Sequence, residues 1–169
     1  MVVILRQAVS SCVNAAGRKP KHLYILPGGV AEIFVSTPGK HAIVFKSRKG
    51  LCKLSIETGA RLTPCYVFGG TDFFHNLATG DGWLSHLSRV LRAGVTIFWG
   101  KYGLPIPFTP KVTLVMGDPI VPPEGWNGTG PIPTELIDKL HEQFMKAMVE
   151  LFEKHKAICG YPDAKLEVL

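Results

Sequence analysis

A diglycine followed by a glutamate is the first group of residues that could do chemistry. Gly28 and Gly29 come after Pro27 at the end of a short apolar run, and Glu32 follows a few residues later. Glycines lack a Cβ atom, so a ligand can approach the backbone there, and we expect Glu32 to face the same crevice at the carboxyl edge of a sheet. An ordinary surface turn is the alternative. The spacing fits neither G-x-G-x-x-G nor a Walker loop, which argues against nucleotide binding.

The second candidate is the basic segment at residues 46–50. Arg48, Lys49 and Gly50 lie at the start of a predicted helix. Free backbone N–H groups and the helix dipole favour anions at such a position, so a phosphate of CoA or of a glycerolipid could bind there. A solvated basic turn explains the same residues equally well.

A proline-rich loop near the middle of the chain combines aromatic and basic side chains. Trp99, Lys101, Tyr102 and Phe108 lie in or next to this loop. Interfacial anchors have this composition, and each lysine or arginine near an anionic leaflet adds about 1 kcal/mol to binding. The loop therefore predicts a membrane contact, with a core-packed loop as the alternative.

The cysteines point away from metal chemistry. Four cysteines are spread along the chain without C-x-x-C spacing, each in an apolar context. This pattern is typical of buried, reduced thiols rather than zinc ligands or disulfides. We predict no metal site.

Charge and hydropathy narrow the class of partner. The net charge is +6 and the pI about 9.2, which favours nucleic acid, an anionic membrane surface or a phosphorylated cofactor. No zinc-finger, RNP or heptad signature accompanies the basic residues, so we predict no nucleic acid partner. The hydrophobic fraction of 46% indicates an apolar partner such as lipid. No stretch approaches the ~18–20 apolar residues of a spanning helix, and the start of the chain lacks the features of a signal peptide.

Periodic apolar residues predict alternating helices and strands. We expect helices over residues 5–16, 49–58 and 80–91, and strands over residues 22–26, 42–45, 62–68, 95–99 and 112–116. The strand, helix, strand order between residues 42 and 68 implies parallel neighbours with a right-handed crossover. The expected fold is α/β, with a mixed central sheet flanked by helices in a single domain over residues 1–169.

The clearest element is a terminal amphipathic helix over residues 133–157. Thr134 is the expected N-cap, and apolar residues recur at spacings of three and four. We expect Glu142 with Lys146, and Glu150 with Lys154, to form ion pairs. Gly160 can take a left-handed cap after the helix, while the five prolines within residues 119–133 predict an irregular segment before it.

Six ordered motifs carry a family resemblance that covers residue 22 to the end of the chain. They are Pro27-Gly-Gly-Val-Ala-Glu32, Phe45-Lys-Ser-Arg-Lys-Gly-Leu-Cys-Lys-Leu54, Glu57-Thr-Gly-Ala-Arg-Leu-Thr-Pro-Cys-Tyr-Val-Phe-Gly69, Phe98-Trp-Gly100, Pro105-Ile-Pro-Phe108 and Gly117-Asp-Pro-Ile120. Together with the terminal helix they resemble the type 2 diacylglycerol acyltransferase family, which also contains monoacylglycerol and wax acyltransferases.

The resemblance implies an enzyme of the endoplasmic reticulum membrane, on its cytosolic face, or of the lipid droplet. It implies a glycerolipid acyltransferase-like fold, with acyl-CoA as co-substrate, a neutral glycerolipid acceptor and no bound cofactor. By the same resemblance, Gly28, Gly29 and Glu32 line the substrate cleft together with Arg48, Lys49 and Gly50. Pro64 matches the proline of the strand that follows.

Two departures from the family pattern bear on catalysis. Gly70 stands where the family has Glu or Gln. The family's His-Pro-His-Gly block and membrane hairpin would precede residue 1, so we expect the fold to be incomplete at its amino terminus and the catalytic histidine to be absent. In related enzymes an Asp follows that histidine five residues later, a partner missing for each of His22, His41, His75, His86, His141 and His155. Loss of a general base lowers a rate roughly 10²–10⁴-fold. A non-catalytic lipid or acyl-CoA binding protein is therefore the alternative function, and a nucleotide-binding module a weaker one.

Overall fold

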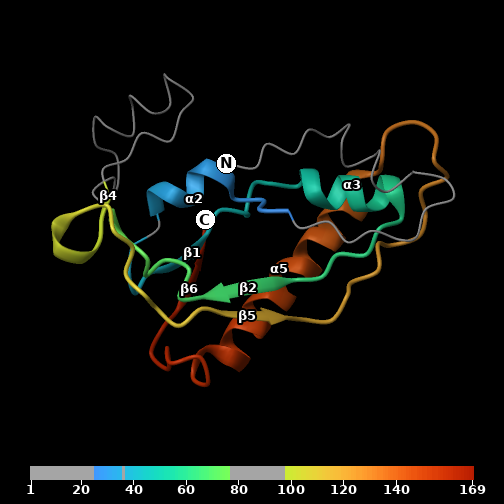
Figure 1. Cartoon of the computed structure of the whole chain (residues 1–169). Coiled ribbons are helices and arrows are strands. Elements are labelled where there is room, and N and C mark those ends of the chain that lie inside the picture. Colours follow the sequence, from blue (N-terminus) through green and yellow to red (C-terminus); the bar gives the residue numbers. More distant parts are fainter. Residues whose placement is uncertain (1–24, 36, 77–97) are drawn as a thin grey trace, which may run out of the picture.

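The computed structural model describes residues 25–35, 37–76 and 98–169 (Figure 1). The predicted helices over residues 5–16 and 80–91 lie outside the described residues, as do most of the predicted strands over residues 22–26 and 95–99. Ile25 and Leu26, the described end of the first of these strands, have no regular secondary structure.

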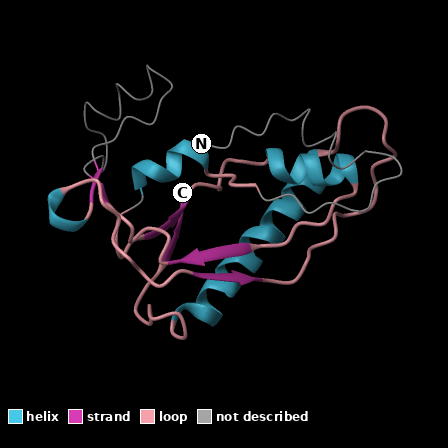
Figure 2. Ribbon diagram, viewed as in Figure 1, coloured by secondary structure: helices cyan, strands magenta, loops and turns pink. Residues whose placement is uncertain are grey.

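The described chain alternates short strands with helices. In order, the elements are α2 (Gly29–Val35), β1 (His41–Ile43), α3 (Gly50–Thr58), β2 (Cys65–Phe68), β3 (His75–Asn76), β4 (Phe98–Trp99), the 3-10 helix η1 (Lys101–Gly103), β5 (Thr113–Met116), α5 (Thr134–Lys156) and β6 (Leu166–Val168). Figure 2 shows the strands as short pieces connected by long loops.

Within residues 25–35, 37–76 and 98–169, the strands form three separate pairs rather than the single central sheet that we expected. β1 pairs with β6 in parallel, whereas β2 with β5 and β3 with β4 are antiparallel. The strand, helix, strand prediction is wrong in its pairing, because β1 and β2 each take a partner from the second half of the chain. The mixture of helix and strand among the described residues is compatible with the α/β class.

Helix α3 confirms the prediction for residues 49–58 almost to the residue. It buries Cys52, Ser55 and Ile56, and burial raises the pKa of the Cys52 thiol to about 11. Gly59 ends the helix with φ 67°, a left-handed conformation that costs glycine little. Thr58 adds a bond from its hydroxyl to the Leu54 carbonyl.

Helix α5 provides one wall of the core. Its buried face contains Leu140, His141, Phe144, Met148, Leu151 and Phe152. The helix contacts β2, β5 and α3, and in Figure 1 it crosses behind the β2–β5 pair. Tyr66 and Phe68 of β2 point into the same core.

Three details of α5 differ from the sequence prediction. The N-cap is Pro133, whose carbonyl accepts the first helical N–H bonds, so Thr134 is the first helical residue and makes no capping bond. The predicted ion pairs are also wrong. Glu150 instead lies 4.0 Å from Lys146, and Lys156, for which no pair was predicted, lies 2.7 Å from Glu153.

The predicted strands are shorter in the structure. The prediction over residues 62–68 becomes β2 alone, because Pro64 has no N–H to donate and Leu62 forms only an isolated bridge with Ile120. Residues 119–133 contain no helix or strand apart from that bridge residue, as predicted. Among the helices of the described ranges, none combines the length and apolarity needed to cross a bilayer.

Candidate functional site

Glu32, in α2, folds back over the diglycine turn. A Cβ atom added to Gly28 would lie 1.8 Å from the Glu32 Cδ, so the carboxyl group occupies the space that this glycine leaves. The Val44 N–H donates to Glu32 Oε1 at 3.3 Å. Burial raises the pKa of Glu32, opposed by this hydrogen bond and by the charge of Arg48.

Arg48 lies over the other glycine of the turn. Its Nη1 donates to the Pro27 carbonyl at 2.7 Å, and a Cβ atom on Gly29 would lie 3.8 Å from the same nitrogen. The structure therefore brings Gly28, Gly29, Glu32 and Arg48 together. We call these four residues the carboxylate side of the site.

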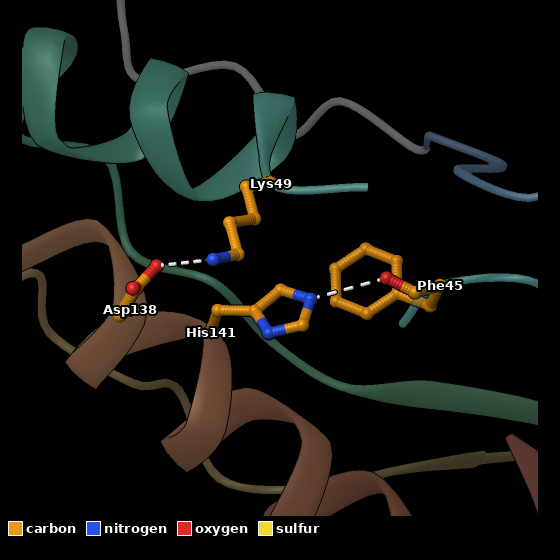
Figure 3. Close-up of polar contacts among 4 residues, drawn as sticks. All are labelled: Phe45, Lys49, Asp138 and His141. Atoms are coloured by element: carbon orange, nitrogen blue, oxygen red, sulfur yellow. Dashed lines mark hydrogen bonds and ion pairs between the residues drawn. The ribbon is translucent and has the colours of Figure 1, made fainter. Parts of the chain in front are cut away.

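Lys49, the next residue, points in a different direction. Its Nζ forms an ion pair with Asp138 Oδ1 of α5 at 2.6 Å (Figure 3). Both side chains are about half exposed. Gly50 begins α3, and a Cβ atom there would meet nothing within 4 Å. The predicted cationic patch is thus divided between Arg48 and Lys49.

A histidine on α5 completes this second region, and the sequence analysis gave it no role. The His141 Nε2 lies 3.1 Å from the Phe45 carbonyl oxygen, and the two rings stack with centroids 5.0 Å apart and planes at 15° (Figure 3). Because a carbonyl only accepts, this contact requires a hydrogen on Nε2. We call Lys49, Asp138 and His141 the imidazole side.

One signal in the sequence could have found His141. It lies four residues after Ile137 and three before Phe144, on the apolar stripe of α5. A histidine at a core position needs a hydrogen-bond partner, and here the Phe45 carbonyl supplies one.

A shallow recess of about 410 Å³ opens beside the imidazole side. It is lined by Lys46, Lys49, Asp138, His141, Glu142 and Met145. Neither Glu32 nor Arg48 lines it, so the recess belongs to the imidazole side alone. Its two lysines could contact an anionic group, with two carboxylates nearby.

Pro64 is fully buried in the core. Its carbonyl accepts the Gly117 N–H at 2.8 Å, and a Cβ atom on Gly117 would lie 2.9 Å from the Pro64 ring. In this position Pro64 packs at the end of the β2–β5 pair.

The loop predicted to contact a membrane exposes only some of its anchors. Tyr102 is 92% exposed and has φ 60°, while Trp99, Lys101 and Phe108 are half-buried. The Phe108 ring meets His75 edge to face at 5.3 Å. Other apolar side chains of this region are exposed instead, namely Phe98, Leu104 and Ile106.

A polar cluster, buried at His41 and Tyr66 and half-buried at Asp72 and Tyr161, lies against the aromatic core, and the sequence analysis missed it. His41 Nδ1 is 2.9 Å from the Tyr66 hydroxyl, and the Tyr161 hydroxyl donates to Asp72 at 2.6 Å. Burial lowers the pKa of His41, with the Asp72 charge opposing. The hydrogen bond to Asp72, with burial, raises the pKa of Tyr161 to about 12. Among the described residues, no group of three or more His, Cys, Asp or Glu could hold a metal ion.

Comparison with known proteins identifies relatives along the whole chain. The family model described as diacylglycerol acyltransferase matches residues 1–169. 2-Acylglycerol O-acyltransferase 3 from Homo sapiens is 34% identical over 150 residues, covering 82% of this chain and 42% of the relative. No solved structure matches.

Two further relatives carry related names. Diacylglycerol O-acyltransferase 2 from Homo sapiens is 32% identical over 156 residues, covering 85% of this chain and 39% of its own length. Acyl-CoA wax alcohol acyltransferase 2 from Homo sapiens is 29% identical over 157 residues, covering 86% of this chain and 46% of the relative. The chain thus spans less than half the length of these relatives.

Proposed function

This chain belongs to the diacylglycerol acyltransferase family, and from that premise we propose that it takes part in acyl transfer from fatty acyl-CoA to the hydroxyl of diacylglycerol. In this reaction the hydroxyl oxygen bonds to the thioester carbon, the C–S bond breaks, and the hydroxyl proton passes to the departing CoA thiolate, which leaves as the thiol. We assign binding and positioning to the residues of this chain.

The observation that carries the proposal is the joint arrangement of the predicted site residues. Glu32 and Arg48 lie against the two glycines of the turn. Lys46 and Lys49, from the same basic segment as Arg48, line an open recess. Acyl-CoA has a phosphate-bearing end, which suits Lys46 and Lys49. These charges are exposed, so each contact adds a modest free energy that salt screens.

We propose diacylglycerol as the acceptor. The names of the relatives give the alternative acceptors against which this choice can be tested. Their names include 2-acylglycerol, diacylglycerol and wax alcohol acyltransferases. The matching family model carries the description diacylglycerol acyltransferase, which supports the choice of diacylglycerol.

We further propose that the protein works at the cytosolic face of the endoplasmic reticulum membrane or at the lipid droplet. The exposed side chains of Tyr102, Leu104 and Ile106, close in sequence to Lys101, support a contact with a lipid surface. Tyr102→Ser should weaken co-sedimentation with anionic liposomes, and unchanged co-sedimentation would remove this loop from the contact.

The test of the proposed activity is acyl transfer from labelled oleoyl-CoA in microsomes that express the protein. Diacylglycerol, monoacylglycerol and a long-chain alcohol are offered as competing acceptors. Labelled triacylglycerol above the background of empty microsomes supports the proposal. Oleoyl-CoA binding without product would support the non-catalytic acyl-CoA binding protein instead, and absence of both would reject both functions.

A further inference from the structure

The carbonyl of Phe45 is the point at which the basic segment is held. It accepts a hydrogen bond from the Arg48 N–H at 2.9 Å within the segment. It accepts a second one from His141 Nε2 of α5 at 3.1 Å (Figure 3). The first bond closes the turn that leads into α3. The second ties this turn to a helix 96 residues away in sequence.

The imidazole of His141 has little freedom to leave this carbonyl. The side chain is 8% exposed, and its ring stacks on Phe45, which also touches Phe144 with ring centroids 5.1 Å apart. On the backbone side, the N–H groups of Phe45 and Lys46 both donate to the Leu169 carbonyl, at 3.0 and 2.9 Å. The start of the basic segment is therefore fixed from two directions.

Asp138 holds the other end of the segment. It lies three residues before His141 on α5, and its carboxylate is 2.6 Å from Lys49 Nζ. Residues three apart on a helix share a face, so one face of α5 contacts both ends of the segment. The recess with its two lysines lies at this contact.

We infer that His141 is a positioning residue for binding of the phosphate-bearing end of acyl-CoA. By holding the Phe45 carbonyl it sets the direction of Lys46 and Lys49 at the recess, where these two lysines contact the phosphates. This inference rests on the proposed function, because acyl-CoA is the ligand. It requires the hydrogen-bond donor of His141 and not a charge on the ring.

Two substitutions separate the donor from the packing. His141→Phe keeps an aromatic ring against Phe45 but has no donor, whereas His141→Gln keeps an N–H donor. His155→Gln is the matched control, because His155 lies on the same helix and bonds to the Leu151 carbonyl of that helix rather than to the basic segment. All variants are first compared by thermal denaturation, so that affinities are measured on folded protein.

The first measurement is oleoyl-CoA affinity of the full chain by fluorescence titration. We expect His141→Phe to bind about 5-fold more weakly, the order set by one net hydrogen bond, while His141→Gln and His155→Gln stay within about 2-fold of the original. Equal affinity of folded His141→Phe and the original protein would overturn the inference. A loss in His141→Gln as large as in His141→Phe would also overturn it, because keeping an N–H donor would then not preserve binding.

The second measurement needs no ligand and separates this inference from the proposed function. Amide hydrogen exchange at residues 45–49 should be about 5-fold faster in His141→Phe and restored in His141→Gln. If the original protein binds no oleoyl-CoA, the proposed function fails, while the exchange data still decide whether His141 positions the segment. Unchanged exchange in His141→Phe contradicts the positioning role directly.

Discussion

Arg48 and Lys49 are neighbours with the same charge, yet they serve different regions of the molecule. Arg48 is half-buried and directs its guanidinium to the Pro27 carbonyl next to Glu32. Lys49 is half exposed and pairs with Asp138 beside an open recess. The carboxylate side is therefore an internal arrangement, whereas the imidazole side can meet a ligand. A run of basic residues in a sequence shows how many positive charges are present but not where each side chain points.

The glycines of the two sides differ in the same way. The Glu32 carboxyl fills the space beside Gly28, and Arg48 Nη1 lies 3.8 Å from the position of a Cβ atom on Gly29. Gly50, by contrast, borders open space. In the structure the group close to Gly28 is a carboxyl group of the chain itself, and the predicted approach of a ligand stays a prediction.

The largest expected effect comes from Gly28→Ala. The added Cβ would collide with the Glu32 carboxyl, so Glu32 must swing away and leave the Val44 N–H without its acceptor. We expect the free energy of unfolding to fall by about 1–2 kcal/mol, measured by urea denaturation. Gly50→Ala is the control and should be neutral or stabilising by up to about 1 kcal/mol. Equal changes in the free energy of unfolding for Gly28→Ala and Gly50→Ala would contradict the difference that we describe between the carboxylate side and the imidazole side.

A somewhat smaller effect should separate Arg48 from Lys49. Arg48→Met removes a charged donor from the Pro27 carbonyl and should destabilise the protein by about 1 kcal/mol, below the usual range for charged hydrogen bonds because the side chain is only partly buried. Lys49→Met breaks an exposed ion pair and should cost less than about 0.5 kcal/mol. Urea denaturation measures which variant loses more stability. A larger loss for Lys49→Met than for Arg48→Met would contradict the internal role of Arg48 and the exposed role of Lys49.

Asp138→Asn should strengthen ligand binding. The amide oxygen can still accept from Lys49, but the negative charge that competes with an anionic ligand is gone. An exposed ion pair is worth roughly 0.2–1 kcal/mol, so oleoyl-CoA affinity should rise by about 2–5-fold at low salt. Isothermal titration with Asp163→Asn as the control measures this change. Weaker binding would mean that the carboxylate charge itself is needed to place Lys49.

The smallest effect concerns pH and Glu32. Burial raises the pKa of this carboxyl, so the folded protein holds its proton more tightly than the unfolded chain. Its contribution to stability therefore declines as pH rises above the ordinary value of 4.5, and the penalty persists at neutral pH. Glu32→Gln keeps an acceptor for Val44 without the charge. It should melt above the original protein at pH 7, with the difference vanishing below pH 4.5, and a lower melting temperature at pH 7 would contradict this sign.

Local patterns predicted α3 and α5 well, missed α2, and predicted the strand pairing poorly. The periodicity of α5 and the glycine after α3 are short-range signals, and both elements lie where expected. The pairing of β1 depends on β6, the last strand of the described chain, and no local pattern shows that two segments so far apart are neighbours. Hence the single mixed sheet was wrong although its strands at residues 42–45 and 112–116 were found within a few residues.

The sequence predicted which residues belong to the candidate site but not the directions in which their side chains point. Sequence motifs selected Gly28, Glu32 and Arg48, which the structure brings together. Lys49 pairs with Asp138 of α5, whereas Arg48 donates to the Pro27 carbonyl. His141 was missed because its partner is a backbone carbonyl, which carries no side-chain signal in the sequence.

The most direct test of the account is the salt dependence of oleoyl-CoA binding by three proteins: the original chain, Lys49→Met and Arg48→Met. If the lysines contact the phosphates and Arg48 acts within the protein, affinity of the original falls as salt rises, and Lys49→Met binds more weakly with a flatter dependence. Arg48→Met, once shown to be folded, should keep the original slope. A flattened slope in Arg48→Met with an unchanged slope in Lys49→Met would contradict the account.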